Sequence, residues 1–239
     1  MWYLLKTPKL QLAITLILIY LSSLIKSDLT LSWYILPLCV GFTIFFDLLF
    51  TFLRKKVLFM PLSSLVSGLI IALIINPQAL WYQVAVICAL AMASKNFVRL
   101  SNKHIFNPAA VGLFLGGIIF NLNVSWWGSS FQTHFWDFLI LLTPGIISFY
   151  KMKRYGSILS FLIVYELLTG FKNLLDPTTI FFALVMLPEP MTSPFDLKKQ
   201  ILYGAIVAVA ITILSYFPIL PDVFIPALLL GNLFTRRVY

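Results

Sequence analysis

A basic segment in the middle of the chain carries the residue types best suited to binding an anion or a polar ring. Lys95, Arg99 and Lys103 follow one another at intervals of four residues, and His104, one of only two histidines in the chain, comes next. Cations at this spacing have two interpretations. They either bind an anionic or polar group, or they are ordinary basic anchors at the cytoplasmic end of a membrane helix.

Directly after the basic residues the sequence predicts the start of a helix. Asn107 suits the N-cap position, and Pro108 suits the first turn, where its missing N–H is no loss. The positive end of the helix dipole is therefore expected beside Lys103 and His104. An anion or a polar ring at this helix start is the chemistry that the spacing favours.

The elements that hold this segment are predicted to be membrane helices. Of 239 residues, 61% are hydrophobic and 10% are charged, and the mean hydropathy is +0.98. A soluble domain of this length cannot bury so much apolar surface, and long apolar runs without alternation predict helices rather than strands. We therefore predict an all-α polytopic membrane protein, with residues 1–239 forming a single integral membrane domain in the lipid bilayer.

Ten apolar segments separated by polar residues are predicted to cross the membrane. They cover roughly residues 10–25, 32–53, 61–75, 79–93, 105–122, 135–150, 156–170, 177–188, 201–217 and 221–235. With the N-terminus inside, fifteen of the seventeen Lys and Arg residues are cytoplasmic, and only Lys26 and Lys172 are outside. Both termini are therefore expected in the cytoplasm and the protein in the cell inner membrane. This topology explains the net charge of +9 without nucleic acid as a partner. No small-residue cleavage site follows the first segment, which is expected to be retained.

The ten segments divide into two halves of five, residues 1–124 and 135–239. Because five is odd, a repeat of this size must be inverted in the membrane. The third segment of each half is short and begins at a proline, Pro61 or Pro177, and the fifth opens with Phe-x-Pro-Ala in both halves. Short segments of this kind at matching positions indicate a binding site near the midplane. The residues predicted to face each other there are Ser63, Ser64 and Gly68 on one side and Thr178 and Thr179 on the other.

Three motifs in the chain resemble those of a known family. Residues 103–112 read Lys-His-Ile-Phe-Asn-Pro-Ala-Ala-Val-Gly, residues 186–194 read Met-Leu-Pro-Glu-Pro-Met-Thr-Ser-Pro, and residues 220–232 contain Leu-Pro-Asp and Leu-Leu-Leu-Gly-Asn. In this order they resemble motifs of the NqrB/RnfD family, the membrane subunits of Na+-translocating NADH:quinone reductase and Rnf electron transport complexes. The resemblance covers roughly residues 61–235 and would make the chain a short, divergent member.

The resemblance implies a ten-helix inverted repeat like that of urea and ammonium channels. It also implies a complex with other membrane subunits, in which electron transfer through a flavin, FMN or riboflavin, is coupled to Na+ or H+ movement. The family attaches FMN to the Thr of a Ser/Asp-Gly-Ala-Thr motif in the outer loop, but residues 123–134 have no such motif. Non-covalent flavin is therefore the expectation. The family's Asp-Pro is also Glu189-Pro190 here, and its Pro-Asp-Gly ends in Val223.

The flavin is expected at the cytoplasmic start of the Asn107 helix, beside the loop at residues 189–194. The residues expected to contact it are Lys103, His104, Asn107, Pro108, Glu189 and Thr192. Trp126 and Trp127 either belong to an outer aromatic belt or stack on the ring. The Pro-rich segment at residues 188–199 is either a plain connector or a re-entrant loop that faces the ligand.

Ionisable residues at membrane depth are candidates for an ion path, and they are Asp47, Glu166 and Asp222. Asp47 alternatively pairs with the basic cluster at residues 54–56. Cys39 and Cys88 are interpreted as small core residues, with no metal centre and no catalytic motif in the chain. Two rivals to the electron-transport subunit stay open. One is a channel or transporter for a small polar solute on the same fold, and the other is a cofactor-free scaffold.

Overall fold

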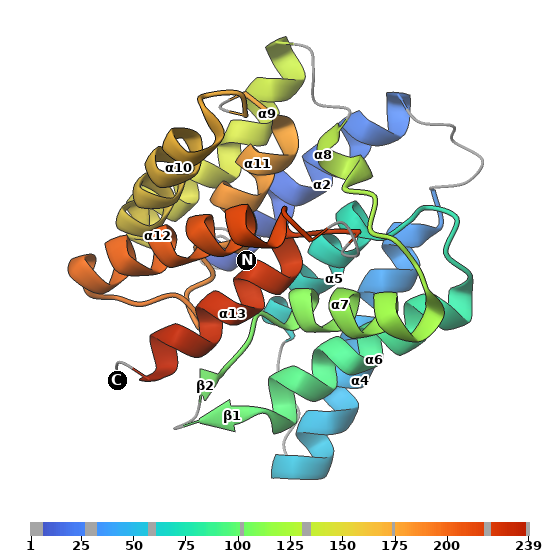
Figure 1. Cartoon of the computed structure of the whole chain (residues 1–239). Helices are drawn as coiled ribbons and strands as arrows, with labels where there is room; N and C mark the ends of the chain where they lie inside the picture. Colours follow the sequence, from blue (N-terminus) through green and yellow to red (C-terminus); the bar gives the residue numbers. More distant parts are fainter. Residues whose placement is uncertain are drawn as a thin grey trace.

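The structure is a computed structural model that describes residues 7–26, 33–56, 61–100, 103–130, 135–173, 175–217 and 221–237. Within these residues the regular structure is almost all helix (Figure 1). The exception is a short antiparallel pair, β1 (Arg99–Leu100) with β2 (Lys103–His104). The predicted all-α class is therefore confirmed. Leu220 of the third motif and residues 131–134 of the outer loop lie outside the described residues.

Among the described residues up to 130, the chain forms five long helices and one short one. They are α2 (Pro8–Lys26), α4 (Ile35–Lys55), α5 (Leu62–Ile74), α6 (Trp81–Phe97), α7 (Pro108–Phe120) and the short α8 (Trp127–Ser130). The start of α7 is the one that the sequence predicts. The Oδ1 of Asn107 accepts from the backbone N–H of Ala110 at 3.1 Å, and Pro108 occupies the first turn. α6 extends four residues beyond its predicted end, which places Lys95 inside the helix.

The second half has five helices among its described residues. It contains α9 (Phe135–Ile146), α10 (Tyr155–Thr169), α11 (Pro177–Phe181), α12 (Leu197–Leu214) and α13 (Phe224–Arg237). α9 continues as a wider π-helical turn over Ile147–Lys151, and α11 continues in the same way over Phe182–Met186. Asp176 and Asp196 cap α11 and α12 through their carboxylates. Each of the ten predicted apolar segments therefore coincides with a continuous helical run in the described part of the chain.

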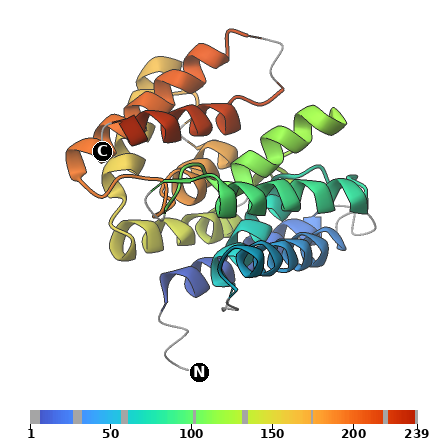
Figure 2. The same ribbon diagram turned by 90° about the horizontal axis from the view of Figure 1, so that it is seen from below.

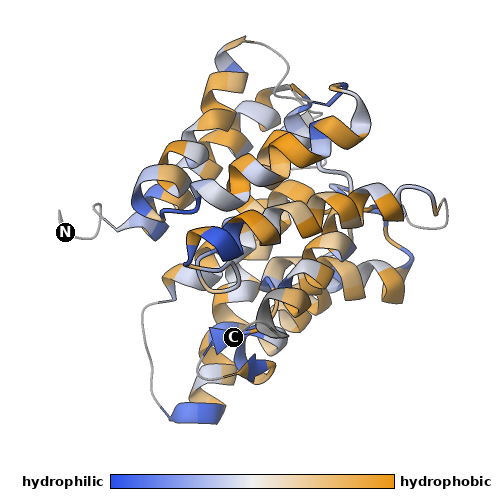
Figure 3. Cartoon of the chain, turned by 60° about the vertical axis from the view of Figure 1, so that its left-hand side comes forward, coloured by the Kyte–Doolittle hydropathy of each residue, from blue (hydrophilic) through white to orange (hydrophobic). Residues whose placement is uncertain are grey.

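Three of the described helical stretches are long and apolar enough to cross a membrane, namely Pro8–Ile25, Ile35–Lys55 and Leu197–Leu214. Shorter apolar helices accompany them. Large apolar side chains lie on the outside, such as Trp136 at 74% exposure and Ile118 at 66%, whereas Asp47 and Arg154 are completely buried. Figure 3 shows hydrophobic residues along the helices and hydrophilic ones mainly near helix ends. Apolar helices of this kind, with large apolar side chains on the outside and charges buried, indicate association with a membrane.

The two halves of the chain lie side by side and meet through two pairs of helices. α4, α6 and α7 pack in series in the first half, and α10, α12 and α13 do so in the second (Figures 1 and 2). Between the halves, α2 contacts α9 and α7 contacts α13. α7 and α13 are antiparallel. The start of α7 bonds the far part of α13, because the N–H of Asn107 donates to Oδ1 of Asn232 at 2.9 Å. At the other end, Asn121 and Asp222 line the same small cavity.

The structure does not bring the five predicted midplane residues together. Ser63, at the start of α5, lies at the same end of the molecule as Val185 and Pro188, with which it lines a cavity. Thr179 bonds Asp176 at the opposite end of the Pro177–Met186 run. The two short helices run in opposite directions, so their starts are far apart. The other predicted residues also have different neighbours. Ser64 bonds Pro61, Gly68 packs on Thr43 and Cys39 of α4, and Thr178 lies in the first turn of α11.

Candidate functional site

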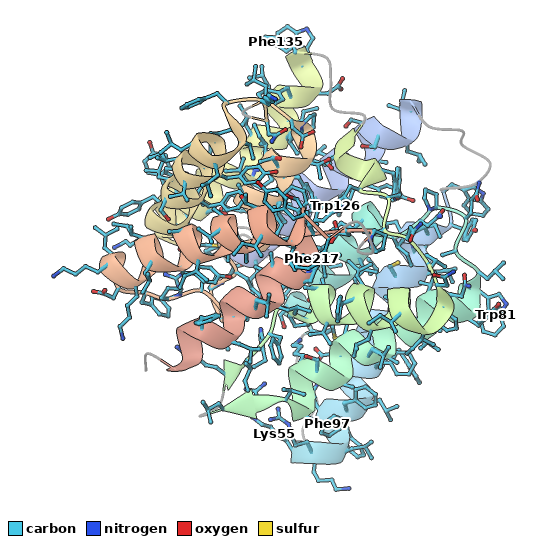
Figure 4. The ribbon with its side chains drawn as sticks, viewed as in Figure 1. Lys55, Trp81, Phe97, Trp126, Phe135 and Phe217 are labelled. Atoms are coloured by element: carbon cyan, nitrogen blue, oxygen red, sulfur yellow. The ribbon has the colours of Figure 1, made fainter. Side chains whose placement is uncertain are left out.

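A cavity of about 430 Å³ opens at the end of the bundle where α4 ends and where α5 and α7 begin. Its volume falls within the range of small-molecule sites, roughly 300–1,000 Å³. Most of its wall is apolar, with Leu12, Val66 and Ile70 among the lining residues. Among the described residues, the charged members of the lining are five cations, Lys9, Arg54, Lys55, Lys95 and Arg99, and two carboxylates, Asp47 and Glu189. Figure 4 shows Lys55 near β1, at the end of the molecule where α4 stops.

The base of the cavity is a buried ion pair. The Nζ of Lys95 lies 2.7 Å from Oδ2 of Asp47 and donates to Oγ of Ser63 at 2.6 Å. The second oxygen of Asp47 accepts from Nδ2 of Asn96 at 2.9 Å, and Asn96 in turn accepts from Thr51. Asp47 therefore does not pair with the basic cluster at residues 54–56, as one interpretation of the sequence had it. Its partner is Lys95, because α6 continues far enough to carry that ammonium back to α4.

Two of the family-like motifs meet beside this pair. The Nε2 of His104 lies 3.0 Å from Oε1 of Glu189, and the hydroxyl of Thr192 donates to Oε2 of the same carboxylate at 3.2 Å. The amide Nδ2 of Asn107 donates to the carbonyl of Met186 at 3.4 Å. His104, Asn107 and Glu189 line the cavity, and Thr192 fixes the orientation of Glu189. The structure therefore brings together four of the residues predicted to contact a ligand.

The other two predicted residues at this end have structural contacts. The ammonium of Lys103 lies 5.1 Å from the ring centroid of Phe195, a cation–π distance. Pro108 is buried in the first turn of α7, where it fixes the helix start next to Asn107. Both residues hold the segment that positions the cavity wall.

Arg154 is a residue of this site that the sequence did not single out. It is fully buried, and its Nε donates to Oγ of Ser193 at 2.8 Å. Its Nη2 donates to the carbonyl of Pro190 at 3.3 Å, and its guanidinium lies 3.9 Å from the centroid of Phe195. Arg154 thus contacts three residues of the segment 188–199 and stabilises the position in which Glu189 lines the cavity. In the sequence, Arg154 resembles any other basic residue at the cytoplasmic end of a helix.

The third motif contributes through Asn232, which joins α7 to α12. Its Oδ1 accepts the backbone N–H of Asn107, and its Nδ2 donates to the hydroxyl of Tyr203 at 2.9 Å. Both Asn232 and Tyr203 are completely buried. Asn107 therefore bonds residues from both of the other motifs, which places all three around the start of α7.

Trp126 and Trp127 occupy a different part of the molecule. Trp126 is 7% exposed, its indole N–H donates to Asp222 at 2.8 Å, and its ring contacts Phe182 and Phe224. Trp127 is 4% exposed and donates to the carbonyl of Ala72 at 2.9 Å, near the end of α5. Figure 4 shows Trp126 close to α8, away from Lys55. Both indoles are packed inside the protein, so they neither form an outer belt nor join the residues around Asn107.

The structure also separates Asp47 from the other two predicted ion-path carboxylates, Glu166 and Asp222. Asp47 lies in the cavity, whereas Asp222 caps the start of α13 by accepting the N–H of Ile225 at 2.8 Å. Glu166 is 1% exposed near the end of α10, and its Oε2 accepts the N–H of Asn173 at 3.3 Å. Its neighbour Tyr165 contacts Phe224, which places Glu166 at the same end as Asp222. A smaller cavity of about 230 Å³ lies at this second end, between the end of α7 and the start of α13.

The fold and the cavity define a class of protein: a helical protein with an apolar exterior, buried charges and a basic cavity at one end of its bundle. No protein-family model matches the chain, and no curated protein matches it.

Proposed function

We propose that this chain is a membrane subunit of an electron transport complex resembling RnfD/NqrB, and that its basic cavity holds a flavin without a covalent bond. One observation carries the proposal. His104, Asn107 and Glu189, which belong to two motifs about 80 residues apart in the sequence, line a single cavity of ligand size. Motif residues that served only to cap a helix or to turn the chain would not need to converge on one cavity.

The chemistry of the cavity fits a flavin ring. An isoalloxazine has a flat apolar body, for which Leu12, Val66 and Ile70 provide a wall. Its polar edge alternates carbonyl acceptors with an N–H donor. Lys95 and Asn107 provide donors for the carbonyls, and the Glu189 carboxylate provides an acceptor for the N–H.

When bound, a flavin supplies one- and two-electron transfer. The chain's own contribution is to orient the ring and to set its electrostatic surroundings. Asp47 holds the Lys95 ammonium in place, so that Lys95 would act on the ring as an oriented hydrogen-bond donor. Coupling to Na+ or H+ movement is part of the proposal and needs partner subunits, for which the apolar outer helix faces offer contact surface.

The proposal includes the ten membrane crossings and two inverted repeats, residues 1–124 and 135–239. It is supported by the antiparallel contact of α7 with α13 and by the matching series of helices in each half. The five cations of the cavity lining belong to segments that the positive-inside pattern assigns to the cytoplasm. We therefore infer that the cavity opens to the cytoplasm, with both termini on that side of the cell inner membrane.

A channel or transporter for a small polar solute is the alternative that one observation favours. A second cavity lies at the opposite end of α7, so that α7 and α13 run between two openings. Buried Trp126 is packed against the start of α13 at that second end. A transporter would move its solute across the membrane of liposomes without bound flavin. A scaffold would show neither solute transport nor flavin binding.

Flavin binding by the detergent-purified protein tests the proposal. Fluorescence quenching of added FMN or riboflavin should be saturable in the wild type and clearly weaker in Asn107→Ser. Serine caps a helix about as well as asparagine, so this variant keeps the helix start and removes only the amide donor. Asn173→Ser, at the opposite end of the protein, is the matched control and should bind as the wild type does. Absence of saturable binding of either flavin to the folded wild type would refute the proposal.

A further inference from the structure

The apolar residues on the α5 side of the basic cavity lie deeper in the protein than its polar residues. The cavity opens where α5 begins, and Ser63 in the first turn accepts from the ammonium of Lys95 at 2.6 Å. Val66 and Ile70 follow Ser63 by three and seven residues, about 5 and 10 Å further along the helix. The inner end of this wall is therefore apolar.

The packing of α4 against α5 supports these depths, because the two helices run in opposite directions. Asp47 of α4 and Ser63 of α5 bond the same ammonium, at 2.7 and 2.6 Å, and therefore lie at one level. Deeper in the protein, Gly68 of α5 packs on Thr43 of α4. Toward the opening, Arg54 follows Asp47 by seven residues, about 10 Å along the axis. The ion pair thus lies between the apolar inner end and the cations at the opening.

The inner end is enclosed by protein. Leu12 of α2, Ile70 of α5 and Val185 of the π-helical run line the cavity and are buried. Ser67, which also lines this part, donates its hydroxyl proton to the carbonyl of Ser63 at 3.1 Å. An apolar space offers water few hydrogen-bonding partners, whereas a hydrocarbon chain gains free energy by leaving water. The inner end therefore favours an apolar occupant.

The carboxylates of the lining already have partners. Both oxygens of Asp47 accept hydrogen bonds, one from Lys95 and the other from Asn96. Both oxygens of Glu189 are bonded as well. Carboxylates satisfied in this way cost less to enclose next to a hydrocarbon chain than free ones.

Cations lie around the opening. Arg54 and Lys55 occupy the last turn of α4 and are exposed, and Arg99 follows α6 in β1. Burial, and after it the charge of Arg54, lowers the pKa of Arg99, which shows that the two guanidinium groups interact. The described lining has five cations against two carboxylates. Its positive potential favours an anion at the opening.

We propose that the cavity binds a single-chain anionic amphiphile, a free fatty acid, with its hydrocarbon chain in the inner end and its carboxylate among the cations of the opening. The levels of Ile70 and Arg54 are about 20 Å apart along the helices. This length fits a saturated chain of about 12–16 carbons, at about 1.3 Å for each bond of the zigzag.

A diacyl phospholipid offers the same chemistry, an acyl chain below an anionic head. We assign the free fatty acid, because a cavity of about 430 Å³ lies near the small end of ligand sites and suits one chain. The inference goes beyond the proposed function and does not rest on it. A fatty acid and a flavin would fill the same space, so each would bind in the absence of the other.

Chain-length selectivity tests where the chain lies. The full-length protein in phosphatidylcholine nanodiscs should bind radiolabelled palmitate, with 16 carbons, at one saturable site that empty nanodiscs lack. Ile70→Phe shortens the inner end and should weaken palmitate at least about tenfold relative to laurate, with 12 carbons. Val66→Phe, about one turn nearer the opening, is the second variant and should weaken both chains. Ile163→Phe, at an exposed position of α10, is the matched control and should keep the wild-type ratio.

The charge of the head is tested with hexadecanol, the uncharged analogue of palmitate. Arg54→Gln/Lys55→Gln should remove most of the preference for palmitate over hexadecanol. Lys151→Gln/Lys198→Gln, which removes two exposed cations outside the lining, should keep that preference.

Three outcomes would overturn the inference. The first is the absence of saturable palmitate binding to the folded wild type, which would leave the flavin proposal untouched. The second is an unchanged palmitate-to-laurate ratio in folded Ile70→Phe and unchanged affinities in Val66→Phe. The third is native mass spectrometry in which the protein retains phosphatidylglycerol but no fatty acid, because the cavity would then hold a phospholipid chain.

Discussion

Lys95 illustrates how a residue's surroundings, rather than its type, determine its role. Its position near the end of α6 resembles that of a basic anchor, yet it is only 8% exposed and is bonded to Asp47 and Ser63. Removing two charges from solvent costs desolvation free energy. Their mutual attraction offsets this cost only when the geometry is good and their remaining lone pairs and protons are hydrogen-bonded. Asn96 and Ser63 supply those further bonds here.

Breaking this pair from one side should destabilise the protein more than removing it altogether. Asp47→Asn leaves the Lys95 ammonium buried without its counter-charge, which typically costs about 3–5 kcal/mol. The double variant Asp47→Asn/Lys95→Met removes both charges and should recover much of the loss. Arg54→Gln, an exposed change two turns further along α4, should stay within about 0.5 kcal/mol. Thermal unfolding in detergent measures all three, and a double variant no more stable than Asp47→Asn would contradict the argument.

The sequence predicted those residues of the candidate site that belong to local motifs, and it missed those whose partners are distant in the chain. His104, Asn107, Glu189 and Thr192 were found because their motifs are local. The partners of Asp47 and Asn107 are remote: Lys95 is 48 residues from Asp47, and Asn232 is 125 residues from Asn107. Without a fold, no local pattern shows that these side chains meet. For the same reason Arg154 and Tyr203 could not be distinguished from an anchor and a core aromatic residue.

At the scale of elements, small residues allow the helices to approach closely. Gly204 of α12 lies against α10, and a Cβ there would be 2.3 Å from the carbonyl of Ser157 and 2.8 Å from the amide nitrogen of Phe161. A Cβ at Gly112 of α7 would likewise lie 2.5 Å from the carbonyl of Ile87 on α6. Lipid gives helices no hydrophobic reason to associate, so close packing at small residues contributes much of their association energy.

Adding one methyl group at the α10–α12 contact should separate the two helices. Gly204→Ala places its Cβ against backbone atoms, which cannot move away by a rotamer change as a side chain can. The free energy of unfolding is therefore expected to fall by about 1–3 kcal/mol. Gly41→Ala is the matched control, because no atom lies within 4 Å of a Cβ built at that helical position. The control should be neutral or slightly stabilising, since alanine is the better helix former. Thermal unfolding of both variants checks the pair, and equal midpoints would show that the contact tolerates the methyl group.

Apolar runs were sufficient to predict the helices but not how they pair. Each predicted segment is helical because an uninterrupted apolar run in lipid must satisfy its own backbone hydrogen bonds. The hairpin of β1 with β2 and the short α8 were missed, since two to four residues give no periodic signal. The contact of Ser63 with Thr178 and Thr179 was predicted from equal positions in two repeats. Antiparallel helices place equal positions at opposite ends, which separates these residues.

In the whole molecule, the cations gather at one end of the helix bundle, whereas the large apolar side chains lie around its sides. The end with the cations is the one that holds the cavity. Lys151, which the topology assigns to the cytoplasm, bonds Gln11 of α2, whose neighbour Lys9 lines the cavity. Ser125 bonds the carbonyl of Ile75 at the far end of α5. The charge pattern in the sequence predicted this segregation, because it depends on the order of segments and not on how they pack.

We predict that Ser125 and Lys151 lie on opposite sides of the membrane. Single cysteines at these positions, treated with a membrane-impermeant maleimide, should react differently: Ser125→Cys in intact cells, and Lys151→Cys only after permeabilisation. Both residues are exposed, so lack of reaction reflects the membrane and not burial. The natural Cys39 and Cys88 are completely buried, which makes the unmodified protein a silent control in both conditions. Labelling of both variants in intact cells would contradict the proposed ten-span topology, because an odd number of crossings must separate the two positions.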